Sequence, residues 1–194
     1  MVMQYFDLQT LPAMGWKNGG GVTREIVREP VGASLDDFDW RVSVADIAVA
    51  VPFSRFVGRD RHLLLLEGDG VNLTSAEAGM NVNLLADDTV LVFSGDVDMN
   101  SQLLGGAVRD FNVMTKRGVW QAQVNVWAEA ATVQAQAGLI LQTIGQARCE
   151  HGEGETVLAV GQGCWWQEQM ASLRWQPLSD DAKAIVVVLQ SVNA

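Results

Sequence analysis

The sequence predicts an all-β protein made of two similar β units, and three observations lead to this prediction. Short runs rich in β-branched and large apolar residues recur along the 194-residue chain, with Gly, Asp and Asn between them. No segment keeps apolar residues at helical spacing over several turns. A strand and turn pattern of the first half also returns about half a chain length later, which favours two duplicated β units.

The predicted strands are short and follow one another at the intervals typical of sandwiches and barrels. Each is an apolar or alternating run bounded by turn residues, as in "WRVSVADI" (40–47) and "RHLLLLE" (61–67). The predicted strands are 40–47, 61–67, 90–93, 109–114, 119–126, 139–144, 156–160 and 185–189. This series indicates an all-β sandwich or barrel.

The repeated pattern narrows the architecture. "HLLLLEGDGVNL" (62–73) and "TVLAVGQGCWWQ" (156–167) both consist of an apolar strand, a Gly-x-Gly turn and a second strand. An acidic turn and another apolar strand follow in each half, at 83–93 and 176–189. This plan resembles the cupin barrel, so two copies predict a bicupin, with two cupin or jelly-roll β-barrel units packed together in one compact chain. An immunoglobulin-like sandwich and other jelly rolls stay open, because periodicity does not separate them.

The charge balance excludes several classes of partner. The chain has 13 Lys and Arg against 23 Asp and Glu, a formal charge of −10. Nucleic acids and anionic membranes need basic surfaces, so we expect neither as a partner. The N-terminus lacks a secretion signal, and no run of about 18 apolar residues occurs. Cys149 and Cys164 form no C-x-x-C motif, which predicts structural thiols in a reducing, cytoplasmic protein.

Metal and nucleotide chemistry are not expected. Metal-binding cupins use a His-x-His pair, a Glu and a later His, whereas this chain has only His62 and His151, one in each half. The sequence contains no G-x-S-x-G elbow and no phosphate-binding loop around its glycine triplet, 19–21. We therefore predict no metal and no cofactor.

Two features leave alternatives open. Arg41 and Ser43 share one face of a predicted strand, and if this face lines a barrel, Arg41 points inward. It would then either pair with an internal carboxylate such as Glu25 or receive the carboxylate of a ligand. The glycine triplet in "WKNGGGVTREI" (16–26) is either a tight turn or a nest of backbone N–H groups for an anion.

The chain resembles the HutD/Ves family of bacterial proteins in four segments that follow one another within the first 118 residues. The segments are "WKNGGGVTREI", "FDWRVSVADI", "PFSRFVGRDRHLLLLEG" and "RDFNVMTKRG". On this basis we expect a first cupin-like unit at 1–118, which carries the family motifs, and a second, degenerate unit at 119–194. Strand exchange between the two units stays open.

The resemblance implies a bicupin-like fold without metal histidines and a cytoplasmic location. In the HutD branch it implies an association with histidine utilisation through binding of an intermediate such as N-formylglutamate, and in the Ves branch a stress-induced protein. It implies no established reaction. The expected function is therefore metal-free binding of a small anionic metabolite that modulates histidine utilisation or a stress response.

The binding residues expected on this basis all lie in the matching segments. They are Asn18, Gly19, Gly21, Thr23, Arg41, Ser43, Phe53, Phe56, Arg61, Asn112 and Met114. A metal-independent isomerase or epimerase with Glu25 or Asp46 as the base is an alternative. A protein-interaction module with a filled barrel, binding through a strand edge or the Trp165 and Trp166 surface, is another, and a homodimer is compatible with the sequence.

Overall fold

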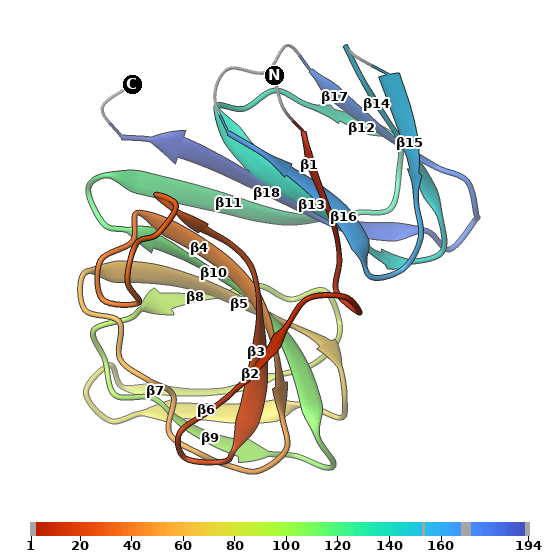
Figure 1. Ribbon diagram of the computed structural model, residues 1–194. Coiled ribbons are helices and arrows are strands. Elements are labelled where there is room, and N and C mark those ends of the chain that lie inside the picture. The colour runs from red at the N-terminus through yellow and green to blue at the C-terminus, as the bar shows by residue number, and fades with distance from the viewer. Residues whose placement is uncertain (1–2, 153, 168–171, 193–194) are drawn as a thin grey trace. The chain divides into compact units, whose positions relative to one another are not determined.

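Every regular element of the described chain is a β-strand, as the ribbon diagram of the computed structural model shows (Figure 1). The structure describes residues 3–152, 154–167 and 172–192. The chain divides into two units: Pro12–Trp120, here called the N-terminal unit, and Gln121–Ala194 with Met1–Leu11, here called the C-terminal unit. The all-β prediction is confirmed.

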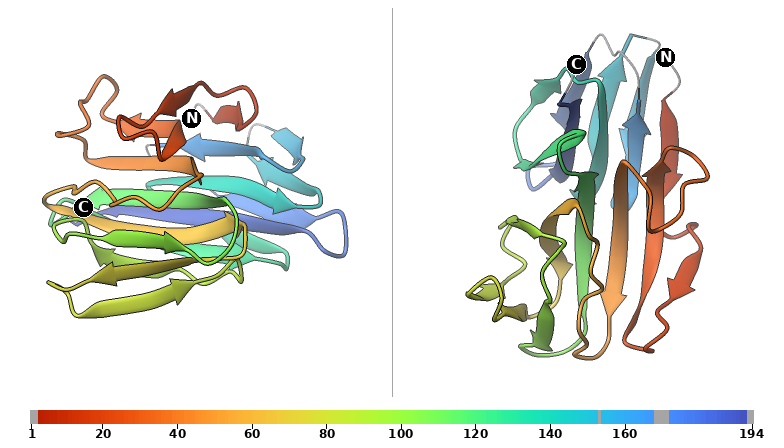
Figure 2. Two further views of the ribbon diagram at one scale, coloured as in Figure 1. Left: turned by 90° about the horizontal axis from the view of Figure 1, so that it is seen from below. Right: turned by 90° about the vertical axis from the view of Figure 1, so that its left-hand side faces the viewer.

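The N-terminal unit consists of a six-stranded and a three-stranded antiparallel sheet. Its large sheet has the strand order β2-β3-β4-β10-β5-β8, and its small sheet has the order β7-β6-β9. The large sheet contains β2 (Ala13–Gly15), β3 (Gly21–Glu29), β4 (Trp40–Ile47), β10 (Val108–Lys116), β5 (Arg59–Glu67) and β8 (Leu91–Ser94). The small sheet contains β7 (Met80–Leu84), β6 (Val71–Ser75) and β9 (Asn100–Leu103). Figure 2 shows the yellow-green strands β6, β7 and β9 to one side of the large sheet.

The two sheets of the N-terminal unit enclose an apolar core. Leu63 and Leu65 from the large sheet pack with Val71, Leu73 and other apolar side chains in one buried cluster. Side chains two apart on a strand share a face, so the alternate residues of β5 that include Leu63 and Leu65 face this core. The register of the large sheet determines which polar side chains lie on the same face as Leu63 and Leu65.

The C-terminal unit repeats the two-sheet plan. Its sheets have the orders β1-β16-β13-β18-β11 and β12-β17-β14-β15. The first contains β1 (Gln4–Asp7), β16 (Gln162–Trp166), β13 (Ala137–Ile144), β18 (Lys183–Ser191) and β11 (Trp120–Trp127), and the second β12 (Ala131–Val133), β17 (Leu173–Pro177), β14 (Ala147–His151) and β15 (Gly154–Leu158). Trp166, Trp175, Cys149 and Cys164 are buried in its core. Both thiols are free.

The N-terminal strand lies in the C-terminal unit. β1 pairs with β16, with Tyr5 opposite Cys164, and the segment up to Leu11 groups with the C-terminal unit, whereas the sequence pattern places it in a first unit of 1–118 and leaves strand exchange between the units open. The pairing joins residues about 160 positions apart. The pattern of turns and strands in the first half does not indicate a pairing partner so far along the sequence, so this pairing could not be predicted from it.

Over the described residues, the sheets do not close into barrels. In the N-terminal unit β8 pairs with β5 and β7 pairs with β6, and both strands end their sheets. The unit is therefore an open, two-layered form of the predicted cupin-like barrel, with a seam between β7 and β8. A pocket lies in this seam.

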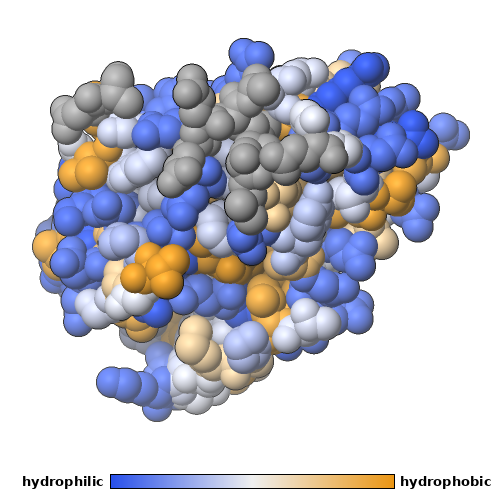
Figure 3. Space-filling model, turned by 45° about the horizontal axis from the view of Figure 1, so that its top comes forward, coloured by the Kyte–Doolittle hydropathy of each residue, from blue (hydrophilic) through white to orange (hydrophobic). Residues whose placement is uncertain are grey.

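The surface is mostly polar on the face that Figure 3 presents, where hydrophobic residues lie in small groups among hydrophilic ones. In the described ranges, no helix has the length and apolar character needed to span a membrane.

Candidate functional site

The inner face of the large sheet of the N-terminal unit carries an unusual number of polar side chains. Register places Met114 of β10 opposite Arg41 of β4 on one side and Arg61 of β5 on the other. The next row along the sheet contains Ser43 and Asn112. All of these side chains are at least nine-tenths buried, and they share their faces with core residues.

One more row along, the inner face carries a carboxyl group. Asp110 lies opposite Ala45 of β4 and Leu65 of β5, and only 2% of its surface is exposed. Asp110 is absent from the residues expected from the sequence. The signal that could have found it is its place in "RDFNVMTK", two residues before Asn112 and therefore on the same face.

Arg41 pairs with a carboxylate of the protein. Its Nε donates to Oε2 of Glu25 at 2.7 Å, and the other oxygen of Glu25 lies 3.3 Å from Nε of Arg28. Of the two interpretations of Arg41, the internal ion pair is therefore the one present. Its positive charge is balanced within the protein.

Arg61 has a different environment. Its Cζ lies 5.3, 5.6 and 5.0 Å from the ring centres of Phe53, Phe56 and Phe93. Its hydrogen bond to a backbone carbonyl, that of Ser54, is long at 3.3 Å, and its Nε has no partner. The aromatic faces attract the cation, but no carboxylate of the described residues forms an ion pair with it.

Burial and the charges on the inner face perturb the pKa values of this cluster. Burial lowers the pKa of Arg61 to about 10, with Asp110 opposing and Arg41 adding to the effect. Burial raises the pKa of Asp110 to about 7, although Arg61 pulls it down. Asp110 Oδ1 and Asn112 Oδ1 have no hydrogen-bond partner. Buried polar atoms without partners are rare in folded proteins, and Arg61 Nε, Asp110 Oδ1 and Asn112 Oδ1 are among those on this inner face.

The glycine triplet forms the turn between β2 and β3. The amide of Gly19, at φ +71°, donates to the Trp16 carbonyl, and the amide of Gly20 donates to the Asn18 side chain at 3.1 Å. Thr23 accepts a 2.7 Å hydrogen bond from the Trp16 indole. The side chains of Asn18 and Thr23 thus have partners within the turn, which matches the tight-turn interpretation.

Gly21 is required for a second reason. A Cβ atom at this position would lie 2.3 Å from the backbone oxygen of Asp46 on β4. Glycine permits such a close approach of two strands. Three of the predicted binding residues therefore shape the turn beside the inner face and are not part of it: Asn18, Gly19 and Gly21. Five others form part of the inner face itself: Arg41, Ser43, Arg61, Asn112 and Met114.

The two predicted loop aromatics lie beside Arg61. Phe53 is buried and forms an isolated bridge with Met99, and the amide of Phe56 donates to the Gly95 carbonyl at 2.8 Å. Both rings contribute to the aromatic environment described above. Phe93, which the sequence analysis did not select, completes it because β8 pairs with β5 and places Phe93 opposite Arg61.

The two candidate catalytic bases are held in ion pairs. Glu25 binds Arg41 and Arg28, and Asp46 binds Arg24 and Arg109. Burial would raise the pKa of Asp46, but the hydrogen bonds from the two arginines outweigh it and lower the pKa.

The two histidines lie in different units and have different surroundings. Burial lowers the pKa of His62 on β5, and His151 Nε2 lies 3.0 Å from the Tyr5 hydroxyl in the C-terminal unit. Across the described residues, no group of three or more His, Cys, Asp or Glu side chains is arranged to hold a metal ion.

The tryptophan pair of the C-terminal unit, considered above as an interaction surface, is largely covered. Trp166 is fully buried and Trp165 is partly buried, so the tryptophan pair does not form a continuous exposed patch. Inside this unit Gln142 is buried and accepts a 2.9 Å hydrogen bond from the Trp175 indole. Its amide donates to the Ile144 carbonyl at 2.7 Å, so this internal polar group is satisfied.

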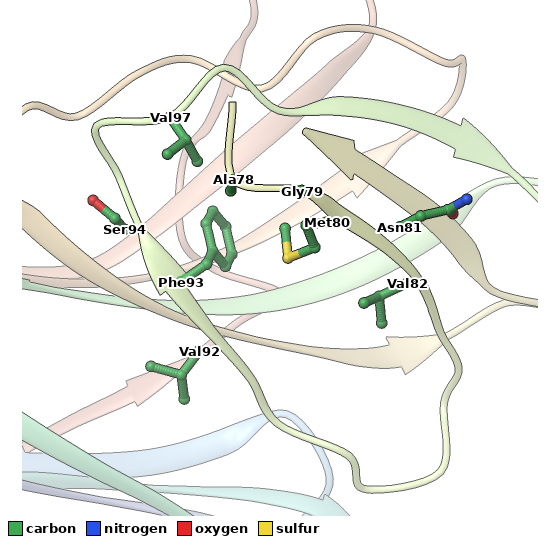
Figure 4. Close-up of a pocket in the computed structure, with 9 residues that line it drawn as sticks. All are labelled: Ala78, Gly79, Met80, Asn81, Val82, Val92, Phe93, Ser94 and Val97. Atoms are coloured by element: carbon green, nitrogen blue, oxygen red, sulfur yellow. The ribbon is translucent and has the colours of Figure 1, made fainter. Parts of the chain in front are cut away.

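A pocket of about 480 Å³ opens in the seam of the N-terminal unit. Residues of β7, β8 and the two adjoining loops line it, and Figure 4 shows Phe93 among the side chains of Ala78, Met80 and Val97. Phe93 therefore contacts both this pocket and Arg61.

Comparison with known proteins places this architecture in a family. The HutD family model matches residues 8–186. An uncharacterized 21.2 kDa protein in the hutC 3′ region of Pseudomonas putida is 37% identical over 139 residues, 72% of each chain. Protein Ves from Escherichia fergusonii is 34% identical over 176 residues, 89% of this chain and 87% of that one.

Several solved structures have the same fold as this chain. A conserved protein of unknown function from Pseudomonas aeruginosa PAO1 is similar with a TM-score of 0.89 and 28% identity, over 98% of this chain and 100% of that chain. HutD from Pseudomonas fluorescens SBW25 has a TM-score of 0.84 at 24% identity, over 98% and 99%. A cupin 2 conserved barrel domain protein from Leptotrichia buccalis has a TM-score of 0.62 at 8% identity, over 96% of each chain, which confirms the cupin-like fold. The chain belongs to the HutD family.

Proposed function

We propose that the N-terminal unit binds a small metabolite through a carboxylate and that Arg61 is the main recognition residue. The observation that carries this proposal is the state of Arg61, a buried guanidinium with an unpartnered Nε and no ion pair to a described carboxylate. Leaving a charge buried without a partner costs several kcal/mol (roughly 3–5 when one partner of a pair is removed). A carboxylate ligand would remove that cost and form charge-assisted hydrogen bonds.

The charge of the inner face supports an anionic ligand. Glu25 neutralises Arg41, whereas the opposing charge that acts on Arg61 is that of Asp110, whose pKa of about 7 leaves it partly protonated at neutral pH. The cluster is then slightly positive in an otherwise acidic protein. Asn112 Oδ1 and Asp110 Oδ1 have no hydrogen-bond partner and can accept only from a donor group of the ligand other than its carboxylate.

Family context supplies the first ligands to test. A relative from Pseudomonas putida is named for its position in the hutC 3′ region, and N-formylglutamate and urocanate are carboxylates of histidine degradation. Binding of such an acid would let the chain modulate histidine utilisation. The resemblance to the Ves branch, which implies a stress-induced protein, gives a stress response as the alternative setting for the same binding chemistry.

Thermal unfolding with and without these acids tests the proposal. A ligand at a hundred times its Kd stabilises the folded state by about 2.7 kcal/mol, or roughly 5–10 °C in melting temperature for a protein of this size. Arg61→Met should abolish this increase. Arg117→Met is the matched control, because it removes an equal charge from the surface of the same unit, where Arg117 pairs with Asp60 and Asp96.

An unchanged melting temperature of the wild-type protein at saturating concentrations of both acids would argue against this ligand class. Equal increases in wild type and Arg61→Met would argue against Arg61 as the recognition residue. The enzymatic alternative receives less support, because ion pairs hold both Glu25 and Asp46.

A further inference from the structure

The seam pocket differs chemically from the inner face of the sheet. Its lining contains no charged residue: the side chains of Met80, Val82, Val92, Phe93 and Val97 are apolar, and only Asn81 and Ser94 are polar. Figure 4 shows Met80 and Phe93 beside each other, with Val97 nearby. A pocket of this lining suits an uncharged, apolar group.

One aromatic ring joins the pocket to the buried cation. Phe93 lines the pocket, and the centre of its ring lies 5.0 Å from Cζ of Arg61. β8 holds Phe93 opposite Arg61 in the sheet, and β8 is also the strand whose free edge borders the seam. A ligand that reaches Arg61 past this ring therefore has the apolar pocket beside it.

We propose that the seam pocket between β7 and β8 binds the apolar part of the ligand whose carboxylate binds Arg61. The ligand class is then monocarboxylic acids that carry a short aliphatic chain or an uncharged ring. This inference rests on the proposed function and deepens it. A second carboxylate would find no counter-charge in the pocket and would lose hydration there, so monocarboxylates should bind better than dicarboxylates of equal length. Of the two acids named above, urocanate should therefore bind better than N-formylglutamate, which has two carboxylates.

A homologous series of acids measures the contribution of the pocket. In calorimetric titrations of the whole chain with formate, butyrate and hexanoate, affinity should rise about fourfold for each methylene group buried. Hexanamide, which lacks the charge, should bind far more weakly than hexanoate. Pentanedioate, a dicarboxylate of similar length, should not show this rise in affinity.

Two substitutions in the turn between β6 and β7 distinguish the contribution of the pocket to binding from general effects on the unit. Ala78 lines the pocket and Ala76 does not, and both are exposed. Ala78→Trp should fill the pocket and reduce hexanoate affinity to that of formate, while formate binding persists. Ala76→Trp adds the same ring to the same turn and should leave the whole series unchanged.

The outcomes distinguish this inference from the proposed function. If formate binding depends on Arg61 but affinity does not rise with chain length, or rises equally in Ala78→Trp, the pocket assignment is wrong and the proposed function stands. If hexanoate binds Arg61→Met as well as wild type, the link between pocket and arginine is wrong. If no acid binds the wild-type protein, both proposals are overturned.

Discussion

Asp110 should make the folding stability of the wild-type protein depend on pH in a way that an Asp110→Asn variant lacks. Burial raises the pKa of Asp110 from 3.8 to about 7. Between these values the folded state holds a proton that the unfolded chain has lost, so the wild-type protein loses stability as pH rises through this window. The difference of roughly three pH units corresponds to on the order of 4 kcal/mol. The variant cannot titrate here and should lack this loss.

The charges around Asp110 are part of this prediction. Arg61 on β5 and Arg41 on β4 favour the ionised carboxylate, whereas Asp46 on β4 opposes it, and burial outweighs the two arginines. Denaturant unfolding of wild type and Asp110→Asn at pH 4, 5, 6 and 7 measures the effect as the change in the stability difference. Asp98→Asn removes an exposed carboxylate, and its unfolding free energy should change with pH in parallel with that of wild type. Parallel curves for Asp110→Asn and wild type would refute the assignment of a raised pKa.

Three substitutions test the structural roles of the glycine turn and of the C-terminal core by denaturant unfolding. Gly19→Ala, at positive φ with open space around it, should cost about 1–2 kcal/mol. Gly21→Ala should cost more, about 3 kcal/mol or above, because its Cβ would meet the Asp46 carbonyl; equal losses at the two positions would contradict the close approach. Trp175→Phe leaves the buried Gln142 oxygen without its donor and should cost at least about 1–3 kcal/mol, whereas a neutral result would show that this hydrogen bond does not stabilise the core.

Alternation along single strands predicted the inner face well. "WRVSVADI" alone predicts that Arg41 and Ser43 share one face, which points inward if this face lines a barrel, and both side chains are buried. The same rule applied to β10 reaches Asn112 and Met114 and extends to Asp110. A strand fixes the faces of its side chains locally, so this part of the site is contained in short stretches of sequence.

The partners of Arg61 could not be obtained in this way. Phe93 reaches it only because β8 pairs with β5, and Phe53 and Phe56 come from the loop before β5. Strand pairing and loop packing depend on contacts between distant segments, which local periodicity does not encode. The same limit explains why β1 was not assigned to the C-terminal unit.

Ligand binding and the titration of Asp110 should be coupled, because both involve Arg61. A carboxylate bound at Arg61 would compete for the charge that now favours ionised Asp110 and would place a second negative charge nearby. Both effects raise the pKa of Asp110 in the complex, so binding takes up a proton and affinity falls as pH rises above about 7.

Calorimetric titration with butyrate at pH 7, in buffers of different ionisation enthalpy, measures this proton uptake directly. We expect uptake of a fraction of one proton for wild type and none for Asp110→Asn, with Asp98→Asn again as the control. If wild type and Asp110→Asn take up equal numbers of protons, the coupling does not pass through Asp110. A buffer-independent heat for wild type would mean that the bound carboxylate does not share Arg61 with Asp110, and the ligand would then have to lie elsewhere on the inner face.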